Sequence, residues 1–100
     1  MGEPRKYYNV CDETIYIILK CFVDETYISV DDIHPCLTKE SKCETRKHVV
    51  TKGYVSVVNM QVTMSKNVFW TNPRITEKGL KFLDDHSHLE YIYENFTPEP

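Results

Sequence analysis

The chain has 100 residues, of which 41% are hydrophobic and 12% aromatic, and a formal net charge of −3; this composition favours one folded domain and excludes a wholly disordered chain. Its longest apolar run, Ile15 to Leu19, is far shorter than a membrane span requires. The N-terminus carries no apolar stretch of the secretory type, so we expect a cytoplasmic location, or a nuclear one in a eukaryotic host.

The first predicted element is a helix that begins at Asp12. Apolar residues after it follow the i, i+3, i+4, i+7 spacing of one helical face, and they are Ile15, Ile18, Leu19 and Phe22. Asp12 and Glu13 stand near the positive N-terminal end of this helix, where carboxylates are stabilising. Residues 1–8 before it have no periodic pattern and are expected to form a flexible arm.

The next segment predicts a short strand and then a short helix. Residues 27–28 are too few for an independent strand, but they could pair with a later hairpin. Ser29 opens a helix through Ile33, with Asp32 three residues on as a weak relative of the capping box. Pro35 should end this helix, because proline disfavours helical geometry at the preceding residue.

A longer helix is predicted over residues 39–52. Thr38 is a suitable N-cap, and Gly53 supplies the usual stop. The pattern then changes period, because β-branched and aromatic residues dominate residues 54–62 and 68–70. The turn residues Ser65-Lys66-Asn67 between these two runs predict a β-hairpin.

A final helix is expected after Thr76, its N-cap, with Leu80 and Leu83 on one face. After Ser87 the helical spacing resumes at Leu89, Ile92, Tyr93 and Phe96. Either one bent helix or two short helices fit this pattern.

The order helix, short strand, helix, helix, hairpin, helix is that of a winged helix-turn-helix, an α+β fold in which the hairpin is the wing. We therefore predict a three-helix core, a β-hairpin wing and an additional C-terminal helix. The expected boundaries are a flexible arm over residues 1–8, a winged-helix domain over residues 9–85, and a C-terminal helix extension with an acidic tail over residues 86–100.

Several segments carry a family resemblance. Residues 49–55, VVTKGYV, resemble the junction between the third helix and the wing of winged-helix proteins, and residues 75–83, ITEKGLKFL, resemble the start of the helix after the wing. Together with Ile17–Lys20 and Asp32-Ile33, their spacing is similar to that of small phage and prophage-associated YjcQ-like proteins over residues 14–85. This resemblance implies a winged helix and no particular activity.

The charge is unevenly distributed along the chain. Residues 38–53 hold five basic and two acidic residues, a balance of +3, whereas residues 84–100 hold five acidic and no basic residues, a balance of −5. A basic middle and an acidic tail can each have a separate partner.

The basic middle favours double-stranded DNA as the partner. On a helical wheel of residues 39–52, Cys43 and Val49 lie on one side, and polar residues lie on the other side, which winged helices turn toward the major groove. The leading hypothesis is thus a small transcriptional regulator, viral or prophage-like. Its predicted DNA-contacting residues are Ser41, Lys42, Thr45, Arg46, His48, Lys52 and Lys66. Because Glu44 lies among them and would repel phosphate, a merely solvated face is the alternative.

The last helical pattern leaves two interpretations open. Its apolar and aromatic side chains either form a surface for a homodimer or another protein, or fold back as a last core layer. The residues of such a surface are Leu89, Ile92, Tyr93 and Phe96. The principal alternative function is a winged helix that binds protein without binding DNA, which the acidic net charge favours.

No metal, cofactor or enzymatic activity is expected. His34, Cys36, Cys43 and His48 lack the paired spacing of zinc ligands, and the four cysteines are expected to be free thiols. The sequence has neither a glycine-rich phosphate loop nor a recognisable pair of catalytic carboxylates. Trp70 is expected to pack against the helix over residues 39–52 or the first helix, with a stacking platform for nucleic acid as the alternative.

Overall fold

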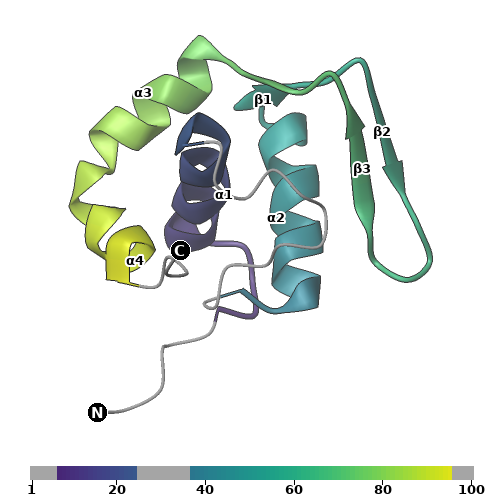
Figure 1. Cartoon of the computed structure of the whole chain (residues 1–100), viewed down its shortest axis with the longest axis horizontal. Helices are drawn as coiled ribbons and strands as arrows, with labels where there is room; N and C mark the ends of the chain where they lie inside the picture. Colours follow the sequence, from purple (N-terminus) through teal and green to yellow (C-terminus); the bar gives the residue numbers. More distant parts are fainter. Residues whose placement is uncertain (1–6, 25–36, 96–100) are drawn as a thin grey trace.

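The computed structural model describes residues 7–24 and 37–95. Within these ranges the chain is α+β, with helices on both sides of a central helix and one hairpin beyond them (Figure 1). The predicted strand at 27–28 and the predicted helix from Ser29 to Ile33 lie outside the described residues. In chain order the elements are α1 (Asp12–Asp24), α2 (Lys39–Thr51), β1 (Val55–Ser56), β2 (Asn59–Val62), β3 (Val68–Thr71), β4 (Arg74–Ile75), α3 (Glu77–Asp85), the 3₁₀ turn η1 (Ser87–Leu89) and α4 (Glu90–Asn95).

Helix α1 begins at Asp12 as predicted and is the centre of the fold. It contacts α2 on one side and α3 and α4 on the other (Figure 1). Every residue from Thr14 to Leu19 is buried, so the helix is enclosed around most of its circumference and not on one face alone. Full burial of a side chain such as Ile17 or Leu19 stabilises the fold by about 1.5–3 kcal/mol.

Helix α2 has both predicted ends. Thr38 is the N-cap, and a capping box forms because its Oγ1 accepts a hydrogen bond from Ser41 N at 3.1 Å while Ser41 Oγ accepts one from Thr38 N at 2.9 Å. After the helix, Gly53 has a φ of +81°, in the left-handed region that glycine adopts without steric cost. The chain then turns directly into β1.

The four strands form the predicted hairpin, which consists of two short antiparallel pairs of strands. Strand β1 pairs with β4 and strand β2 pairs with β3, both antiparallel. Ser56 lies opposite Arg74 in the first pair of strands, and Asn59 lies opposite Thr71 in the second pair. Each of the two segments between these partners advances by three residues, so the two pairs share one register. The interruption falls at Asn72-Pro73, where Asn72 has a φ of +48°. The sequence Asn72-Pro73 thus ends the second strand, β3, at Thr71, and pairing resumes in a separate short strand, β4.

The first turn of α3 docks on the junction between α2 and β1. Thr76 is the predicted N-cap, and its Oγ1 accepts a hydrogen bond from Gly79 N at 3.2 Å. The same hydroxyl lies 2.6 Å from the Gly53 carbonyl oxygen, to which it donates, and 3.0 Å from that of Tyr54. Gly79 is buried against this junction, where an added Cβ would overlap the Tyr54 carbonyl and lie 2.8 Å from Ile75 Cγ1.

The C-terminal helices take the form of two short helices with a 3₁₀ turn between them. Helix α3 ends at Asp85, and its C-cap is His86, whose ring stacks on Phe82 at a centroid distance of 3.9 Å. Phe82 is buried and occupies the core, whereas Leu80 is half exposed. The predicted pairing of Leu80 with Leu83 on the inner face is therefore wrong for Leu80, because the docking of Gly79 turns Phe82 inward.

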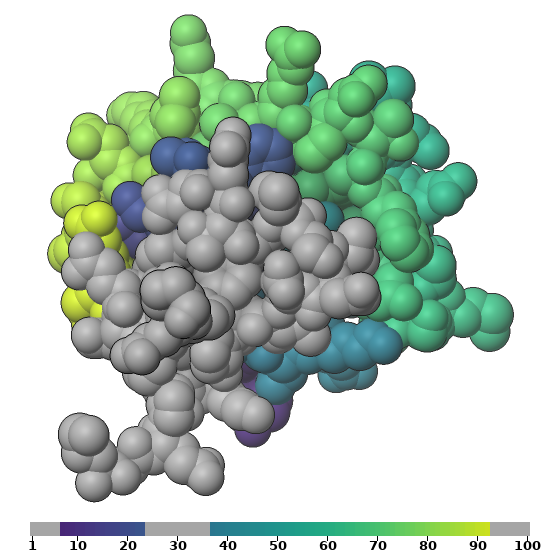
Figure 2. Space-filling view, in the orientation of Figure 1, coloured from purple at the N-terminus to yellow at the C-terminus, as the bar shows by residue number. Residues whose placement is uncertain are grey.

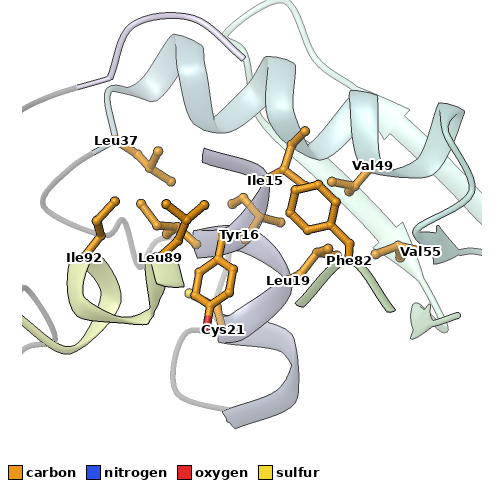
Figure 3. Close-up of a cluster of buried hydrophobic side chains, with 12 residues drawn as sticks. Ile15, Tyr16, Leu19, Cys21, Leu37, Val49, Val55, Phe82, Leu89 and Ile92 are labelled. Atoms are coloured by element: carbon orange, nitrogen blue, oxygen red, sulfur yellow. The ribbon is translucent and has the colours of Figure 1, made fainter. Parts of the chain in front are cut away.

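The hydrophobic core joins all the helices and the base of the hairpin. Figure 3 shows its side chains converging from α1, α2, α3, α4 and β1. Tyr7, which was expected to belong to the flexible arm, forms a β-bridge with Leu37 and packs against this core. Tyr7 therefore belongs to the folded domain and not to a flexible arm.

We expect Gly79→Ala to destabilise the protein, although alanine in a helix is normally favoured over glycine by up to about 1 kcal/mol. The added methyl group must displace the Tyr54 carbonyl and Ile75, and such overpacking costs about 1–3 kcal/mol. Urea unfolding measures the difference, and Lys81→Ala on the exposed side of α3 is the control. A Gly79→Ala protein as stable as the wild type would show that the docking is not close-packed.

Candidate nucleic-acid interface

The N-terminal half of α2 and the tip of the hairpin lie at the same end of the molecule (Figure 1). Helix α2 contacts both α1 and β3, so the hairpin runs alongside the helix on the side away from α1. The tip residue Lys66 is exposed and has a φ of +67°. Thr63 N donates to Asn67 O at 2.9 Å and closes the three-residue loop that carries Lys66.

Two of the predicted DNA-contacting residues, Ser41 and Thr45, are fully buried, which corrects their assignment. They share an i, i+4, i+8 stripe with Val49, and Val49 belongs to the core. Small polar side chains in this stripe allow two helices to approach closely. Their polarity predicted exposure, so the predicted helical wheel is wrong for these two residues, whereas Cys43 and Val49 on its core side are buried as predicted.

Ser41 and Thr45 differ in how their hydroxyl groups are satisfied. Ser41 Oγ takes part in the capping box with Thr38. Thr45 Oγ1 is buried and makes no hydrogen bond with any residue in 7–24 or 37–95. Neither hydroxyl is available to a base edge.

Arg46 lies between α2 and the hairpin. Its guanidinium carbon is 4.1 Å from the centroid of the Trp70 ring, a cation–π geometry, and the Trp70 ring is 6.2 Å from that of Phe22 on α1. Burial lowers the pKa of Arg46, and within the described residues no carboxylate forms an ion pair with it. The expectation that Trp70 packs against these helices is confirmed.

The other predicted DNA-contacting residues of α2 lie at different positions along the helix. Lys42 and His48 are half-buried on the helix, whereas Lys52 is exposed at its C-terminal end, where its carbonyl accepts a hydrogen bond from Lys78 Nζ at 2.7 Å. Lys52 therefore lies at the opposite end of α2 from the N-terminal basic residues. Of the predicted set, Lys42, Arg46 and Lys66 belong to the end where the hairpin tip lies.

Two basic residues of α2 were absent from the predicted set. Lys39 is exposed in the first turn of α2, and Lys47 Nζ lies 3.0 Å from Glu44 Oε1, a hydrogen bond that raises the pKa of Lys47. Their position on the basic segment of the sequence was the available signal. We use the name basic end for the basic residues of α2 from its first turn to Lys47 together with the residue at the hairpin tip: Lys39, Lys42, Arg46, Lys47 and Lys66.

Charge is segregated between the two halves of the described chain. From Lys39 to Ile75 there are seven basic and two acidic residues, a balance of +5, and the two acidic residues are Glu40 and Glu44. From Thr76 to Asn95 there are two basic and five acidic residues, a balance of −3. The helix α2 and hairpin half thus attracts anions, and the α3 and α4 half repels them.

The predicted partner surface near the C-terminus is corrected in part. Leu89 and Ile92 are only 6% and 4% exposed and belong to the core, so the core-layer interpretation holds for both. An ion pair between Lys20 Nζ and Glu90 Oε1 at 3.3 Å joins α4 to α1. The Tyr93 side chain and Phe96 lie outside the described part of the chain.

Cys11, Cys21 and Cys43 are free thiols, in agreement with the prediction for these three. Cys36 and His34 of the rejected zinc set lie outside the described residues. In the part of the chain that the structure describes, no group of three His, Cys, Asp or Glu side chains is arranged to hold a metal ion. No described helix is long and apolar enough to span a bilayer.

Comparison with protein-family models, with curated proteins and with solved structures gives no match to this chain.

Matched substitutions test the burial of the two hydroxyl groups on α2. Thr45→Val should raise the free energy of unfolding by about 1 kcal/mol, because it removes a buried hydroxyl that has no hydrogen-bond partner among the described residues. Ser41→Ala should lower it by about 1 kcal/mol, because it removes half of the capping box. Urea denaturation of both variants checks the pair of signs, and a destabilised Thr45→Val protein would show that Thr45 has a polar partner.

Cys11 should be a slow nucleophile in the folded chain. Burial raises the pKa of its thiol, and the nearby Glu13 carboxylate adds to this effect, so the thiolate fraction at a given pH is smaller than in an unfolded chain. A brief iodoacetamide treatment at pH 8, followed by peptide mass spectrometry, should label Cys11 more slowly in the native protein than in urea. Faster labelling in the native protein would indicate an activated thiolate instead.

Proposed function

We propose that this chain is a winged-helix protein that binds double-stranded DNA, as a small transcriptional regulator would, through its basic end. In this proposal α2 takes the place of the recognition helix, and the hairpin is the wing. A winged helix brings the N-terminal part of its recognition helix and its wing to the same side, where both reach the duplex.

The observation that carries the proposal is the coincidence of position and charge. The start of α2 and the hairpin tip lie at one end of the molecule, and the basic end defined above has five positive residues against the two carboxylates of Glu40 and Glu44 (Figure 1). The hairpin itself, residues 55–75, has no acidic residue. A duplex approaching this end would meet a net positive field.

The contacts that fit this geometry are mainly to phosphates. With Ser41 and Thr45 buried, the polar side chains left on α2 for base edges are few, and His48 is the main candidate among the predicted residues. Lysines bind phosphate oxygens without reading sequence. We therefore propose binding with modest sequence preference, in which affinity comes from the electrostatic term.

The family resemblance supports the same proposal. Residues 49–55 and 75–83, which resemble the helix–wing junction and the post-wing helix of winged-helix proteins, meet in the structure through Thr76, Gly79 and the Gly53-Tyr54 carbonyls. Segments that are separate in sequence thus form one structural unit. This contact is a physical reason why the two motifs occur together in one chain.

Protein binding without DNA is the rival function. It is favoured by the exposed carboxylates of Glu40 and Glu44, because they interrupt the positive surface of α2. The salt dependence of DNA binding separates the two functions, since neutralisation of phosphates releases condensed counterions and protein binding by an apolar surface does not.

DNA binding should weaken steeply between about 50 and 200 mM salt, and removal of one phosphate contact should reduce the logarithmic slope by about one. Lys66→Asn and Lys39→Ala should both show this effect in fluorescence anisotropy with a mixed-sequence duplex. Asparagine is chosen at position 66 because it tolerates the left-handed backbone there and so removes the charge without new strain.

Lys81→Ala is the matched control, because Lys81 is an exposed lysine on the acidic α3 side of the molecule. It should leave both affinity and slope unchanged. If the wild type shows no binding at about 50 mM salt, where nonspecific contacts are strongest, protein binding becomes the better account. Equal losses in Lys81→Ala and Lys66→Asn would contradict the placement of the site.

A further inference from the structure

The outer edge of strand β2 is unpaired. Strand β3 lies between β2 and α2, and β2 runs along the outside of the molecule (Figure 1), so that the hairpin forms the margin of the face seen in Figure 2. Within residues 7–24 and 37–95, β2 pairs with no strand other than β3. Its second edge therefore presents backbone donors and acceptors that no described strand uses.

The alternation of an antiparallel ladder identifies those groups. Thr63 N donates to Asn67 O, so residues 63 and 67 form a hydrogen-bonded pair. Such pairs alternate along the ladder, which makes Gln61 with Phe69 the next one. The backbone N–H and C=O groups of Met60 and Val62 therefore point away from β3, toward the free edge.

This edge lacks the features that normally keep sheet edges apart. Natural edge strands carry lysine, other charged residues or proline, which prevent pairing with another chain. From Gly53 to Ser65 the sequence has no charged residue and no proline. Along the same stretch Val58 is 75% exposed and Met64 is fully exposed.

We propose that β2 pairs antiparallel with β2 of a second copy of this chain, about a two-fold axis at Gln61, and joins the two hairpins into one four-stranded sheet. In this register Met60 lies opposite Val62 of the other copy, so the two residues with outward backbone groups form the hydrogen-bonded pairs. Gln61 lies opposite Gln61 of the other copy. The edge is thus complementary to itself in backbone hydrogen bonding.

The side chains match in the same register. Asn59 lies opposite Thr63, which pairs polar with polar. Val58 and Met64, the two most exposed apolar residues of the hairpin, follow directly at the two ends of this paired stretch. Lys66, the nearest charged residue in sequence, lies in the hairpin turn outside the paired stretch. A second copy is therefore the partner that this edge fits without an unpaired charge.

The proposal replaces the dimer surface that the sequence analysis placed at residues 89–96, where Leu89 and Ile92 are in the core. It is independent of DNA binding, because the association is measured on the protein alone. Sedimentation velocity of the full-length chain over a wide range of concentration should show a reversible monomer–dimer equilibrium.

Substitutions at Gln61 test the register, because this exposed residue would face its own copy across the axis. Gln61→Lys and Gln61→Glu should each weaken the dimer about fivefold, since like charges then lie directly opposite each other. An equimolar mixture of the two variants should recover association to at least the wild-type level. Thr71→Lys, an equally exposed change on the outer face of β3, should leave the dimer unaffected.

Circular dichroism and thermal unfolding should show that all three variants keep the fold. A wild type that stays monomeric at the highest concentration would overturn the proposal. So would a dimer that Thr71→Lys weakens as much as Gln61→Lys, or a mixture of the two Gln61 variants that fails to restore association.

Discussion

The docking of the first turn of α3 on the α2–β1 junction is the constraint on which the other packing depends. Thr76 caps α3 and at the same time binds the Gly53 carbonyl, which fixes the start of α3 against the end of α2. Gly79 permits this approach because it has no Cβ to meet the Tyr54 carbonyl. Phe82 then enters the core one turn later, and its ring meets that of Tyr54 at 5.1 Å. The same contact closes the base of the hairpin, since β1 and β4 flank it.

The packing of α2 determines which surface the molecule offers to a partner. The stripe of Ser41, Thr45 and Val49 is buried, and Arg46 is held over Trp70 between the helix and the hairpin. The packing of α2 against the rest of the fold therefore buries side chains that would otherwise face a ligand. What remains at the outer surface is a set of lysines with two glutamates among them, and this favours contacts with phosphate over the reading of bases.

Charge and hydrogen bonding divide the hairpin into two functional parts. The tip carries Lys66 at the basic end of the molecule, whereas the β2 strand is uncharged and has an edge with which no described strand pairs. A DNA contact at the tip and a self-pairing contact along the edge would use different atoms. In two copies joined antiparallel through β2 the hairpin tips would point in opposite directions, so the edge pairing would not cover either tip.

Local signals in the sequence determined the helix boundaries and the hairpin. Thr38, Gly53 and Thr76 act through hydrogen bonds and backbone angles of their own segments, so their roles could be predicted without knowledge of the neighbours. Residue polarity did not determine burial. Ser41, Thr45, Leu80 and Leu89 were each placed on the wrong side or left undecided, because the orientation of a helix depends on what packs against it. Only the tertiary structure decided that orientation: α2 packs with its polar stripe buried, and Gly79 turns α3 so that Phe82 faces inward.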